Sequence, residues 1–325
     1  MSRLPRMIDT AMDRSVVWGF SAVGPAVRRR LPGWPDDPAP HALRGRQVAI
    51  TGATSGLGLA LAGQVADRGA AVHLVVRDPD RGAVVADQLA ARTGRADAAT
   101  VWRCDVSDAD SVREFTDRFV EAGVRLWGLV HNAGALPDEW TASPQGHELT
   151  MALHVLGPVQ MTEHLLSVFG PGGRVVLITS GGMYAQRLRA DDPDYRDGEY
   201  AGTTAYARSK RAQVELLPIL QDRWGRDGLR VWATHPGWAD TPGVASSLPG
   251  FARITRPILR TAESGVDTTG WLLATEPPPP GGGLWHDRRE RPVSYFSRTR
   301  STAADRARLW RWVSDRLELG EERRG

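Results

Sequence analysis

The segment that most constrains what this chain can fold into is Thr51-Gly-Ala-Thr-Ser-Gly-Leu-Gly58. A short apolar run, Gln47–Thr51, leads into it and predicts a buried strand. An Ala/Leu/Val-rich stretch, Leu59–Arg68, follows it and predicts a helix that Gly69 ends. The glycines therefore lie on a turn that joins a strand to a helix.

Glycine at three positions of this turn suits a bound phosphate. Gly52 permits the tight turn, Gly56 removes a side chain that would keep a pyrophosphate from the backbone, and Gly58 lets the helix pack close to the sheet. The N-terminus of the helix then favours an anion. We expect the turn to bind a dinucleotide, although a tight connection without a ligand would also use glycine. The predicted contacts are Gly52, Thr54, Ser55, Gly56, Leu57 and Gly58.

Strand-like and helix-like segments alternate along most of the chain. The expected strands are Gln47–Thr51, Ala71–Val76, Ala99–Cys104, Trp127–His131, Gly173–Ser180, Leu229–His235 and Leu284–Asp287. The expected helices are Leu59–Arg68, Pro79–Thr93, one that Ser107 caps, Gln145–Phe169, Thr203–Trp224 and Ala303–Glu318. Since parallel strands require crossover helices, this order predicts an α/β fold with a doubly wound parallel sheet. We expect one domain at 45–294, an extension and linker at 1–44, and a helix and tail at 295–325.

The composition excludes several classes of protein. The formal net charge is only +3 and no basic stripe contains interleaved aromatic residues, so we expect no nucleic-acid partner. No apolar run approaches the length of a membrane span. The single cysteine, Cys104, cannot form an intramolecular disulfide, so no disulfide framework sets the compartment, and a cytoplasmic location is the default expectation. On a buried strand this thiol would be inert. The eight histidines show no metal-ligand spacing, so no metal site is expected.

The N-terminal extension contains an apolar run, Ser15–Val23, between Arg14 and the basic residues 28–30. We favour a helix that packs on the domain. The alternative is peripheral membrane contact through residues 8–30, with the basic edge facing anionic lipid on the inner face of a membrane. The Pro-rich segment at 31–40 predicts an irregular connector.

A second chemical feature is Tyr206-Ala-Arg-Ser-Lys210, near the start of a predicted helix. Residues four apart share a helical face, so the phenol and the ammonium project together. A nearby lysine cation lowers the pKa of a tyrosine from its usual value near ~10. Tyr206 could then exchange a proton with a carbonyl or an alcohol, whose oxygen Ser180 would hold. Alone, such a pair is usually an ordinary helix face.

The order of these features along the chain resembles the short-chain dehydrogenase/reductase family, from about Arg44 to about Ser294. The cofactor turn, Asn132-Ala-Gly134 after the fourth strand, and the three residues Ser180, Tyr206 and Lys210 carry the resemblance. A closer likeness is to the subgroup called dehydrogenase/reductase family member 12. That likeness rests on the segments Arg14–Trp18, Thr179–Met183, Tyr206–Arg211, His235–Val244, Asp287–Arg288 and Arg291–Ser294.

The resemblance implies a Rossmann fold and nicotinamide-dependent hydride transfer between a carbonyl and an alcohol. It implies catalytic roles for Ser180, Tyr206 and Lys210, and Lys210 would also hold the nicotinamide ribose. Further cofactor contacts would be Asp105 and Val106 at the adenine, Asn132, Ala133 and Gly134 after the fourth strand, and Pro236, Gly237 and Thr241 at the nicotinamide. The structural alternative for Asp105 is a helix cap. The family likeness also favours a homo-oligomer.

Charge at the end of the second strand favours NADP over NAD. An acidic residue there would bind an NAD ribose and repel a 2′-phosphate. Arg77 lies at that point, and its guanidinium can donate two charge-assisted hydrogen bonds to a phosphate. Ser55 could add a hydroxyl donor to the same phosphate. The adjacent Asp78 complicates this choice, and Arg77 could instead be an exposed cation at a helix end.

His154 stands where the family has an asparagine that completes the catalytic set. A neutral imidazole has one donor and one acceptor and could serve a proton relay to Lys210. With an ordinary pKa near ~6.5, we expect the relay to fail in mild acid. The alternatives are a buried histidine without a catalytic part, or a weak enzyme that acts as a nucleotide sensor or membrane-associated scaffold.

Two further segments bear on the substrate. The acidic stretch Tyr184–Tyr200 forms part of the substrate mouth or a solvated surface loop. The segment Gly243–Arg260 lines an apolar pocket or forms a packed lid, which would suit a small lipophilic alcohol or carbonyl. Its apolar candidates are Ala245, Leu248, Phe251, Ile254 and Ile258.

Overall fold

The computed structural model describes residues 3–243, 250, 253 and 255–320. Its strands are β1 (Gln47–Thr51), β2 (Ala71–Val76), β3 (Ala99–Arg103), β4 (Leu126–His131), β5 (Phe169–Ile178), β6 (Arg230–Thr234), β7 (Leu284–His286) and β8 (Arg289–Arg291). Within this described part they form one sheet in the order β3-β2-β1-β4-β5-β6-β7-β8. Neighbours from β3 to β7 pair in parallel, and β8 pairs antiparallel with β7. The predicted doubly wound parallel sheet is confirmed.

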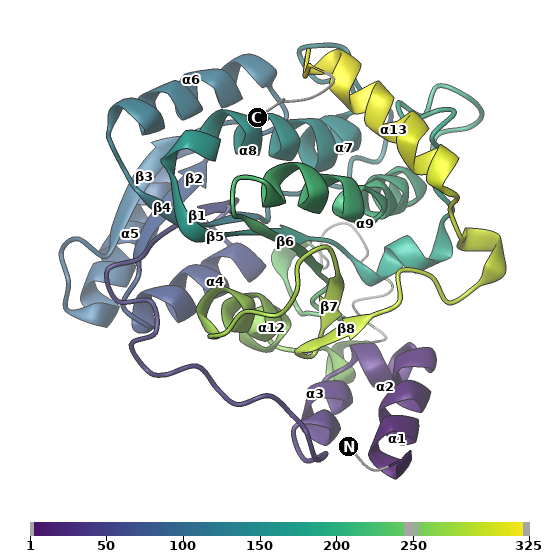
Figure 1. Cartoon of the computed structure of the whole chain (residues 1–325), viewed down its shortest axis with the longest axis horizontal. Helices are drawn as coiled ribbons and strands as arrows, with labels where there is room; N and C mark the ends of the chain where they lie inside the picture. Colours follow the sequence, from purple (N-terminus) through teal and green to yellow (C-terminus); the bar gives the residue numbers. More distant parts are fainter. Residues whose placement is uncertain (1–2, 244–249, 251–252, 254, 321–325) are drawn as a thin grey trace.

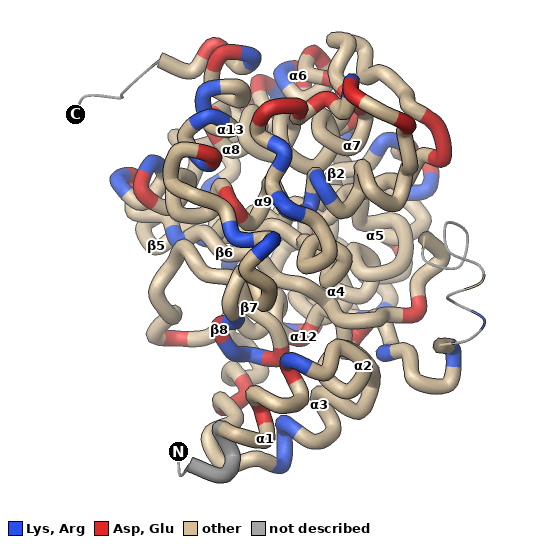
Figure 2. Tube along the Cα trace, turned by 90° about the vertical axis from the view of Figure 1, so that its right-hand side faces the viewer, with Lys and Arg blue, Asp and Glu red and all other residues tan. Residues whose placement is uncertain are grey.

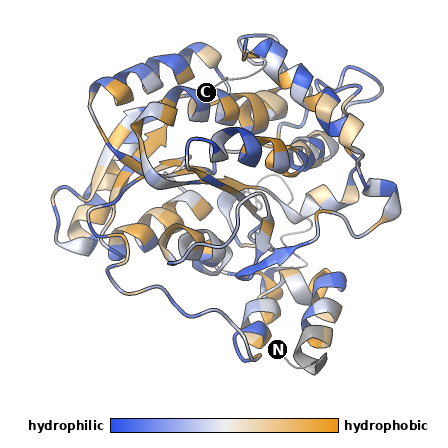
Figure 3. Ribbon diagram, in the orientation of Figure 1, coloured by the Kyte–Doolittle hydropathy of each residue, from blue (hydrophilic) through white to orange (hydrophobic). Residues whose placement is uncertain are grey.

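Helices cover both faces of the sheet (Figure 1). One layer contains α4 (Gly56–Asp67), α5 (Pro79–Thr93) and α12 (Ala262–Ala274). The other contains α6 (Ala109–Glu121), α7 (Leu149–Met151), α8 (Gly157–Leu165) and α9 (Gly202–Gly225), and α13 (Ala303–Arg316) packs over α9. Each layer encloses its own apolar core against the sheet. The charge distribution in the extension and the hydropathy of the layers are drawn in Figures 2 and 3.

Local sequence signals set several of these boundaries. The side chain of Asp78 accepts from the backbone of Asp80 and Arg81, Pro79 opens α5, and Gly94 ends it at φ 67° in the left-handed region. The bounds of β1, β2 and α5 are those expected from the sequence. The cap of α6 is Asp108 rather than the expected Ser107, because the Asp108 carboxylate accepts from Asp110 N.

Two expectations about regular structure are wrong. The helix expected from Gln145 begins at Leu149, where the Glu148 side chain caps it, and it contains a π-helical turn at Ala152–Leu156. The fifth strand begins at Phe169, earlier than expected, and it ends at Ile178. The charged strand β8 carries no apolar pattern and was not expected.

The N-terminal extension forms α1 (Arg3–Arg14), α2 (Val17–Phe20) and α3 (Val23–Arg28). Phe20 is 1% exposed and belongs to the main core, so the extension packs on the domain. Arg28 is fully buried and pairs with Asp9, Asp13 and Asp287, so it cannot form part of a basic edge for lipid. In Figure 2, acidic positions of α1 lie next to basic positions of β8. None of the helices in the described ranges is long and apolar enough to cross a membrane.

Candidate active site

The glycine-rich turn is held from behind by the loop after β4. The Thr51 hydroxyl accepts hydrogen bonds from Asn132 N and Ala133 N, each at 2.9 Å. The Asn132 amide donates to Thr51 O at 2.9 Å and to Gly52 O at 3.1 Å. A Cβ on Gly58 would overlap both Gly52 O and the Asn132 amide. The predicted cofactor residue Asn132 therefore shapes the turn, and Gly58 is required for the close packing.

The geometry of the turn fits a dinucleotide phosphate. Gly56 has φ 51°, and Ser55 precedes α4 in an extended conformation without a side-chain cap. The first N–H groups of this twelve-residue helix are thus not capped by the Ser55 side chain, and Ser55 itself is exposed. Thr241 reaches the same turn, because a Cβ on Gly56 would lie 3.4 Å from Thr241 Cβ. Thr54, Ser55 and Leu57 are the neighbours that would line the phosphate.

At the carboxyl ends of β2 and β3 lie the residues predicted to select the cofactor. Arg77 is exposed directly after β2, whereas the Asp78 carboxylate accepts from the first turn of α5. Asp105 accepts from Ser107 N at 2.9 Å and from the Ser107 hydroxyl at 2.6 Å. Asp105 therefore does not cap α6, and Val106 beside it is buried. Asp78 is also exposed, but its carboxylate is engaged with the backbone at the start of α5, whereas the Arg77 guanidinium has no such role in the described part of the chain.

Ser180 and Tyr206 come together at the end of β5. Ser180 follows this strand and begins a short 3₁₀ turn, Gly181–Ala185, while α9 presents Tyr206 in its first turns. The Ser180 side chain interacts with the Tyr206 hydroxyl. Burial raises the pKa of Tyr206 above its ordinary value, and the interaction with Ser180 opposes that rise. The expected net lowering of this pKa by Lys210 is wrong for this structure, because desolvation of the phenol dominates.

Lys210 is the only lysine in the sequence, and all the other residues counted as Lys or Arg are arginines. It is 2% exposed, its Nζ donates to Ile178 O at 2.8 Å, and Nζ lies 5.6 Å from the Tyr206 ring centroid. Burial lowers the pKa of Lys210 to about 7. An arginine cannot release its proton in a protein, whereas this lysine titrates near neutral pH.

His154 lies in the π-helical turn, under Tyr206. Its ring is edge-on to the Tyr206 ring, with centroids 5.3 Å apart, and its Nδ1 is 2.8 Å from the Ser209 hydroxyl. Because Ser209 donates its one proton to Tyr206 O, its oxygen accepts from His154 Nδ1–H. Nε2 then carries the lone pair, faces Gly134, and has no hydrogen-bond partner among the described residues. Nothing in the sequence pointed to Ser209.

The expectation that His154 becomes protonated in mild acid is wrong. Burial lowers the pKa of His154 well below its ordinary value, and the charge of Lys210 lowers it further. The imidazole therefore stays neutral where the sequence suggested a titration. Its place beside Tyr206 and Lys210 is compatible with the predicted relay role.

The loop after β6 holds the predicted nicotinamide contacts. Pro236 packs toward α12, and Gly237 has φ 75°, in the region that favours glycine. Of the apolar candidates in the following segment, Ile258 is partly buried. The other candidates, Ala245, Leu248, Phe251 and Ile254, lie outside the described residues.

The acidic stretch 184–200 is ordered by its own carboxylates. Asp192 is buried and accepts from Arg196 N at 2.7 Å. Asp194 accepts from Glu148 N at 3.1 Å, and Tyr200 donates to the Glu148 carboxylate at 2.8 Å. The stretch is thus tied to the start of α7 and is more than a solvated loop. Its role at the substrate mouth stays a prediction.

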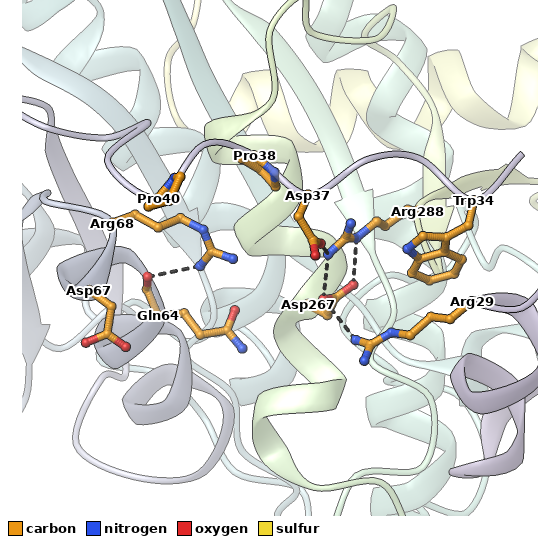
Figure 4. A pocket seen from close by; sticks show the side chains of 10 residues that line it. All are labelled: Arg29, Trp34, Asp37, Pro38, Pro40, Gln64, Asp67, Arg68, Asp267 and Arg288. Atoms are coloured by element: carbon orange, nitrogen blue, oxygen red, sulfur yellow. Dashed lines mark hydrogen bonds and ion pairs between the residues drawn. The ribbon is translucent and has the colours of Figure 1, made fainter.

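A cavity of about 640 Å³ lies away from these residues, between the linker, α4 and α12 (Figure 4). Its charged lining consists of Arg29, Arg68, Arg288, Asp37, Asp67 and Asp267. Arg288 pairs with Asp37 at 2.6 Å and with Asp267 at 2.9 Å. The opposite charges balance, and these pairs fasten the linker to α12. The cavity therefore carries no net charge that would select a ligand.

Two other candidate chemistries find no support in the described ranges. No group of three or more His, Cys, Asp or Glu side chains in them could hold a metal ion. Cys104 is buried, and burial raises the pKa of its thiol to about 12, so the expected inert thiol is confirmed.

Comparisons with known proteins agree with this geometry. The family model for short chain dehydrogenases matches residues 46–250. Dehydrogenase/reductase SDR family member 12 from Bos taurus is 34% identical over 272 residues, covering 82% of this chain and 84% of that protein. Retinol dehydrogenase 12 from Homo sapiens is 30% identical over 274 residues, covering 82% of this chain and 85% of that protein. The solved structure of a short chain dehydrogenase from Burkholderia cenocepacia J2315 in complex with NADP superimposes with a TM-score of 0.61 and is 26% identical in sequence. The match covers 75% of this chain and 96% of that chain.

The family match covers well over half of the chain, and the sheet order agrees with it. The predicted resemblance is therefore confirmed. The chain belongs to the short-chain dehydrogenase/reductase family and is an NAD(P)-dependent oxidoreductase.

Proposed function

We propose that the protein interconverts a carbonyl and an alcohol on a small lipophilic molecule, with NADP(H) as cofactor. The observation that carries this proposal is the convergence of Tyr206, Ser180 and the buried Lys210. The three side chains lie at the carboxyl end of β5, the edge of the sheet where the glycine-rich turn also opens.

In the reductive direction, Ser180 holds the carbonyl oxygen and Tyr206 donates its phenolic proton to it. A nicotinamide cofactor, when bound, would supply the hydride to the carbonyl carbon. Lys210, whose pKa is about 7, returns a proton toward Tyr206 at neutral pH. His154 Nε2, which is buried and has no hydrogen-bond partner among the described residues, would accept from a water on that relay. The carbonyl carbon thus gains two electrons with the hydride, and its oxygen gains one proton.

The preference for NADP rests on Arg77. Its guanidinium is exposed at the end of β2, and the adjacent Asp78 is committed to capping α5. A guanidinium suits a 2′-phosphate, which a carboxylate at that point would repel. The solved relative from Burkholderia cenocepacia contains NADP. The lipophilic substrate class is supported by the retinol dehydrogenase relative.

Isotope transfer tests the proposed reaction. The protein is incubated with NADPH that carries deuterium on the transferred position and with a panel of lipophilic aldehydes and ketones. We expect deuterium at the carbinol carbon of at least one alcohol product, detected by mass spectrometry. NADPH binding without transfer to any member of the panel would instead support the nucleotide-sensor alternative.

We also propose peripheral membrane contact through residues 8–30. Exposed apolar side chains gather on this part of the extension and just before it: Met7, Ile8, Val16, Val17 and Trp18. Trp18 is 59% exposed, while the acidic Asp9 and Asp13 of α1 are buried. The extension therefore turns the carboxylates of α1 inward and presents apolar side chains of α1, α2 and the turn between them outward, which suits the boundary of a lipid bilayer.

Co-sedimentation with vesicles of phosphatidylcholine and phosphatidylserine tests this contact. The wild type should pellet with the vesicles, and Val17→Ser with Trp18→Ser should remain in the supernatant. The control, Val84→Ser with Phe296→Ser, changes side chains that are exposed elsewhere and should still pellet. Equal recovery of all three proteins in the pellet would contradict this contact. A homo-oligomer and a cytoplasmic location stay predictions, and light scattering measures the first.

A further inference from the structure

The loop after β5, which carries the predicted catalytic Ser180, and the loop after β6, which carries the predicted nicotinamide contacts, both meet the N-terminal extension at Phe20. The ring of Phe20 lies edge-on to His235, with centroids 4.5 Å apart, and edge-on to Trp238, at 6.5 Å. Its other face is toward the turn after Ser180, where the Tyr184 ring lies at 6.1 Å. Phe20 is thus a wedge between the loop after β5 and the loop after β6.

Each loop has a glycine where this wedge sits. A Cβ on Gly181 would lie 2.7 Å from Phe20 Cε2, closer than real side chains approach. A Cβ on Gly237 would lie 2.5 Å from Phe20 O. Trp238 N donates to that same carbonyl oxygen at 2.8 Å. The carbonyl oxygen of Phe20 therefore contacts the loop after β6, and the ring of Phe20 contacts Gly181, the residue next to Ser180.

Buried ion pairs fix the extension in this position. Arg28 bonds Asp9 at 2.8 Å and Asp287 at 2.5 Å. Asp287 also accepts from Arg260 at 2.6 Å, and Arg291 bonds Asp9 at 2.9 Å. Removing one partner of such a pair leaves an uncompensated buried charge, which is strongly destabilising. The extension is consequently held to β7, β8 and the segment before α12 in a single arrangement.

Several segments far apart in the sequence converge on this point. The segments Arg14–Trp18, Thr179–Met183, Asp287–Arg288 and the described part of His235–Val244 surround Phe20 or the ion pairs that hold it. They are also the segments through which the sequence resembles one subgroup of the family. Their spatial contact indicates that the extension and the two loops form one unit.

We propose that Phe20 is a positioning residue for the proposed reaction, through which the N-terminal extension sets the position of Ser180 relative to the β6 loop. This inference rests on the proposed function. It makes the extension a part of the active site, although Phe20 is buried and does not face a substrate. A misplacement of a reacting group by about 1 Å can cost on the order of 100-fold in rate.

A size-exchange experiment in the full chain tests this role. Gly181→Ala adds a methyl group that collides with Phe20, although the backbone at Gly181 is outside the left-handed region and tolerates alanine. We expect kcat for NADPH-dependent reduction to fall on the order of 10-fold to 100-fold, with the Kd for NADPH nearly unchanged. Phe20→Leu should lower kcat by about tenfold for the same reason.

The double variant, Phe20→Leu with Gly181→Ala, makes room for the added methyl group. Its kcat should exceed that of Gly181→Ala, a rescue that general destabilisation would not produce. Phe296→Leu is the matched control, since Phe296 is 48% exposed, and it should retain the wild-type kcat. Urea unfolding of each variant shows that the folded protein is being assayed.

The outcomes separate this inference from the proposed function. An active wild type whose kcat is unchanged by Phe20→Leu, or a double variant whose loss equals the product of the two single losses, would overturn the positioning role alone. A wild type without activity on any carbonyl would overturn the proposed function together with the role of Phe20.

Discussion

Replacing Lys210 by methionine should make the folded chain more stable at pH 7 and less stable at pH 10. Burial lowers the pKa of Lys210 to about 7, whereas an unfolded lysine has a pKa near ~10.4. The unfolded chain therefore binds more protons than the folded chain between these values. The stability of the wild type consequently rises with pH through this window, and the cost of the lysine disappears above it.

The magnitude follows from the separation of the two pKa values. About three units at 1.36 kcal/mol each give a cost of about 4 kcal/mol at pH 7. Methionine avoids that cost but leaves Ile178 O without the donor that lies at 2.8 Å, a loss of about 1–3 kcal/mol. The variant should gain about 1–3 kcal/mol at pH 7. At pH 10, just below the pKa of the unfolded lysine, less than about 1 kcal/mol of the lysine's cost remains, so the lost hydrogen bond should dominate.

Two assays check this prediction. Urea unfolding of both proteins at pH 7 and pH 10 gives the difference in free energy of unfolding, in which the other titrating groups cancel. Because the chain has one lysine, labelling with [¹³Cε]lysine gives one side-chain signal, and its midpoint in a pH titration reports the pKa of Lys210. A midpoint near that of free lysine, with the same stability difference at both pH values, would refute the reasoning.

Three other substitutions test neighbouring parts of the site. Arg77→Asp should lower the ratio of kcat/KM for NADPH to that for NADH by about tenfold or more, because it removes a charge-assisted hydrogen bond; an unchanged ratio would remove Arg77 from cofactor selection. His154→Asn should alter kcat but leave the acidic limb of the pH–rate profile in place, because burial keeps His154 neutral; a displaced limb would contradict that. Asn132→Ala should cost about 1–3 kcal/mol of stability through the two carbonyls it leaves unbonded, and it should weaken NADPH binding. Urea unfolding measures the change in stability, and fluorescence titration measures the affinity for NADPH. Unchanged values of both would contradict the role of Asn132 in holding the glycine-rich turn.

The sheet could be predicted because its signals are local. The runs at β1 and β2 are short and apolar, and the glycine-rich turn specifies how the first strand meets its helix. Strand β8 could not be predicted, since its residues Arg289–Arg291 are all charged and only pairing with β7 makes them a strand. The π-helical turn around His154 likewise has no signal in its apolar sequence.

The site could be predicted in its residue types but not in its electrostatics. The pKa values of Tyr206, Lys210 and His154 are set mainly by burial, which depends on segments distant in the sequence. Three consecutive arginines at 28–30 suggested an exposed basic edge, yet Arg28 is buried among carboxylates from α1 and the β7–β8 turn. Phe20 gave no signal, because its partners lie more than 150 positions away along the chain.

The central claim is that Tyr206 donates the proton in an NADPH-dependent carbonyl reduction. Tyr206→Phe deletes only the phenolic hydroxyl, which interacts with Ser180, so it tests this claim most directly. The measurement is kcat for NADPH oxidation with the best carbonyl of the panel, together with the Kd for NADPH by fluorescence titration. We expect turnover to be abolished and the Kd to be nearly unchanged. A Tyr206→Phe variant that retains most of the wild-type kcat would contradict the account.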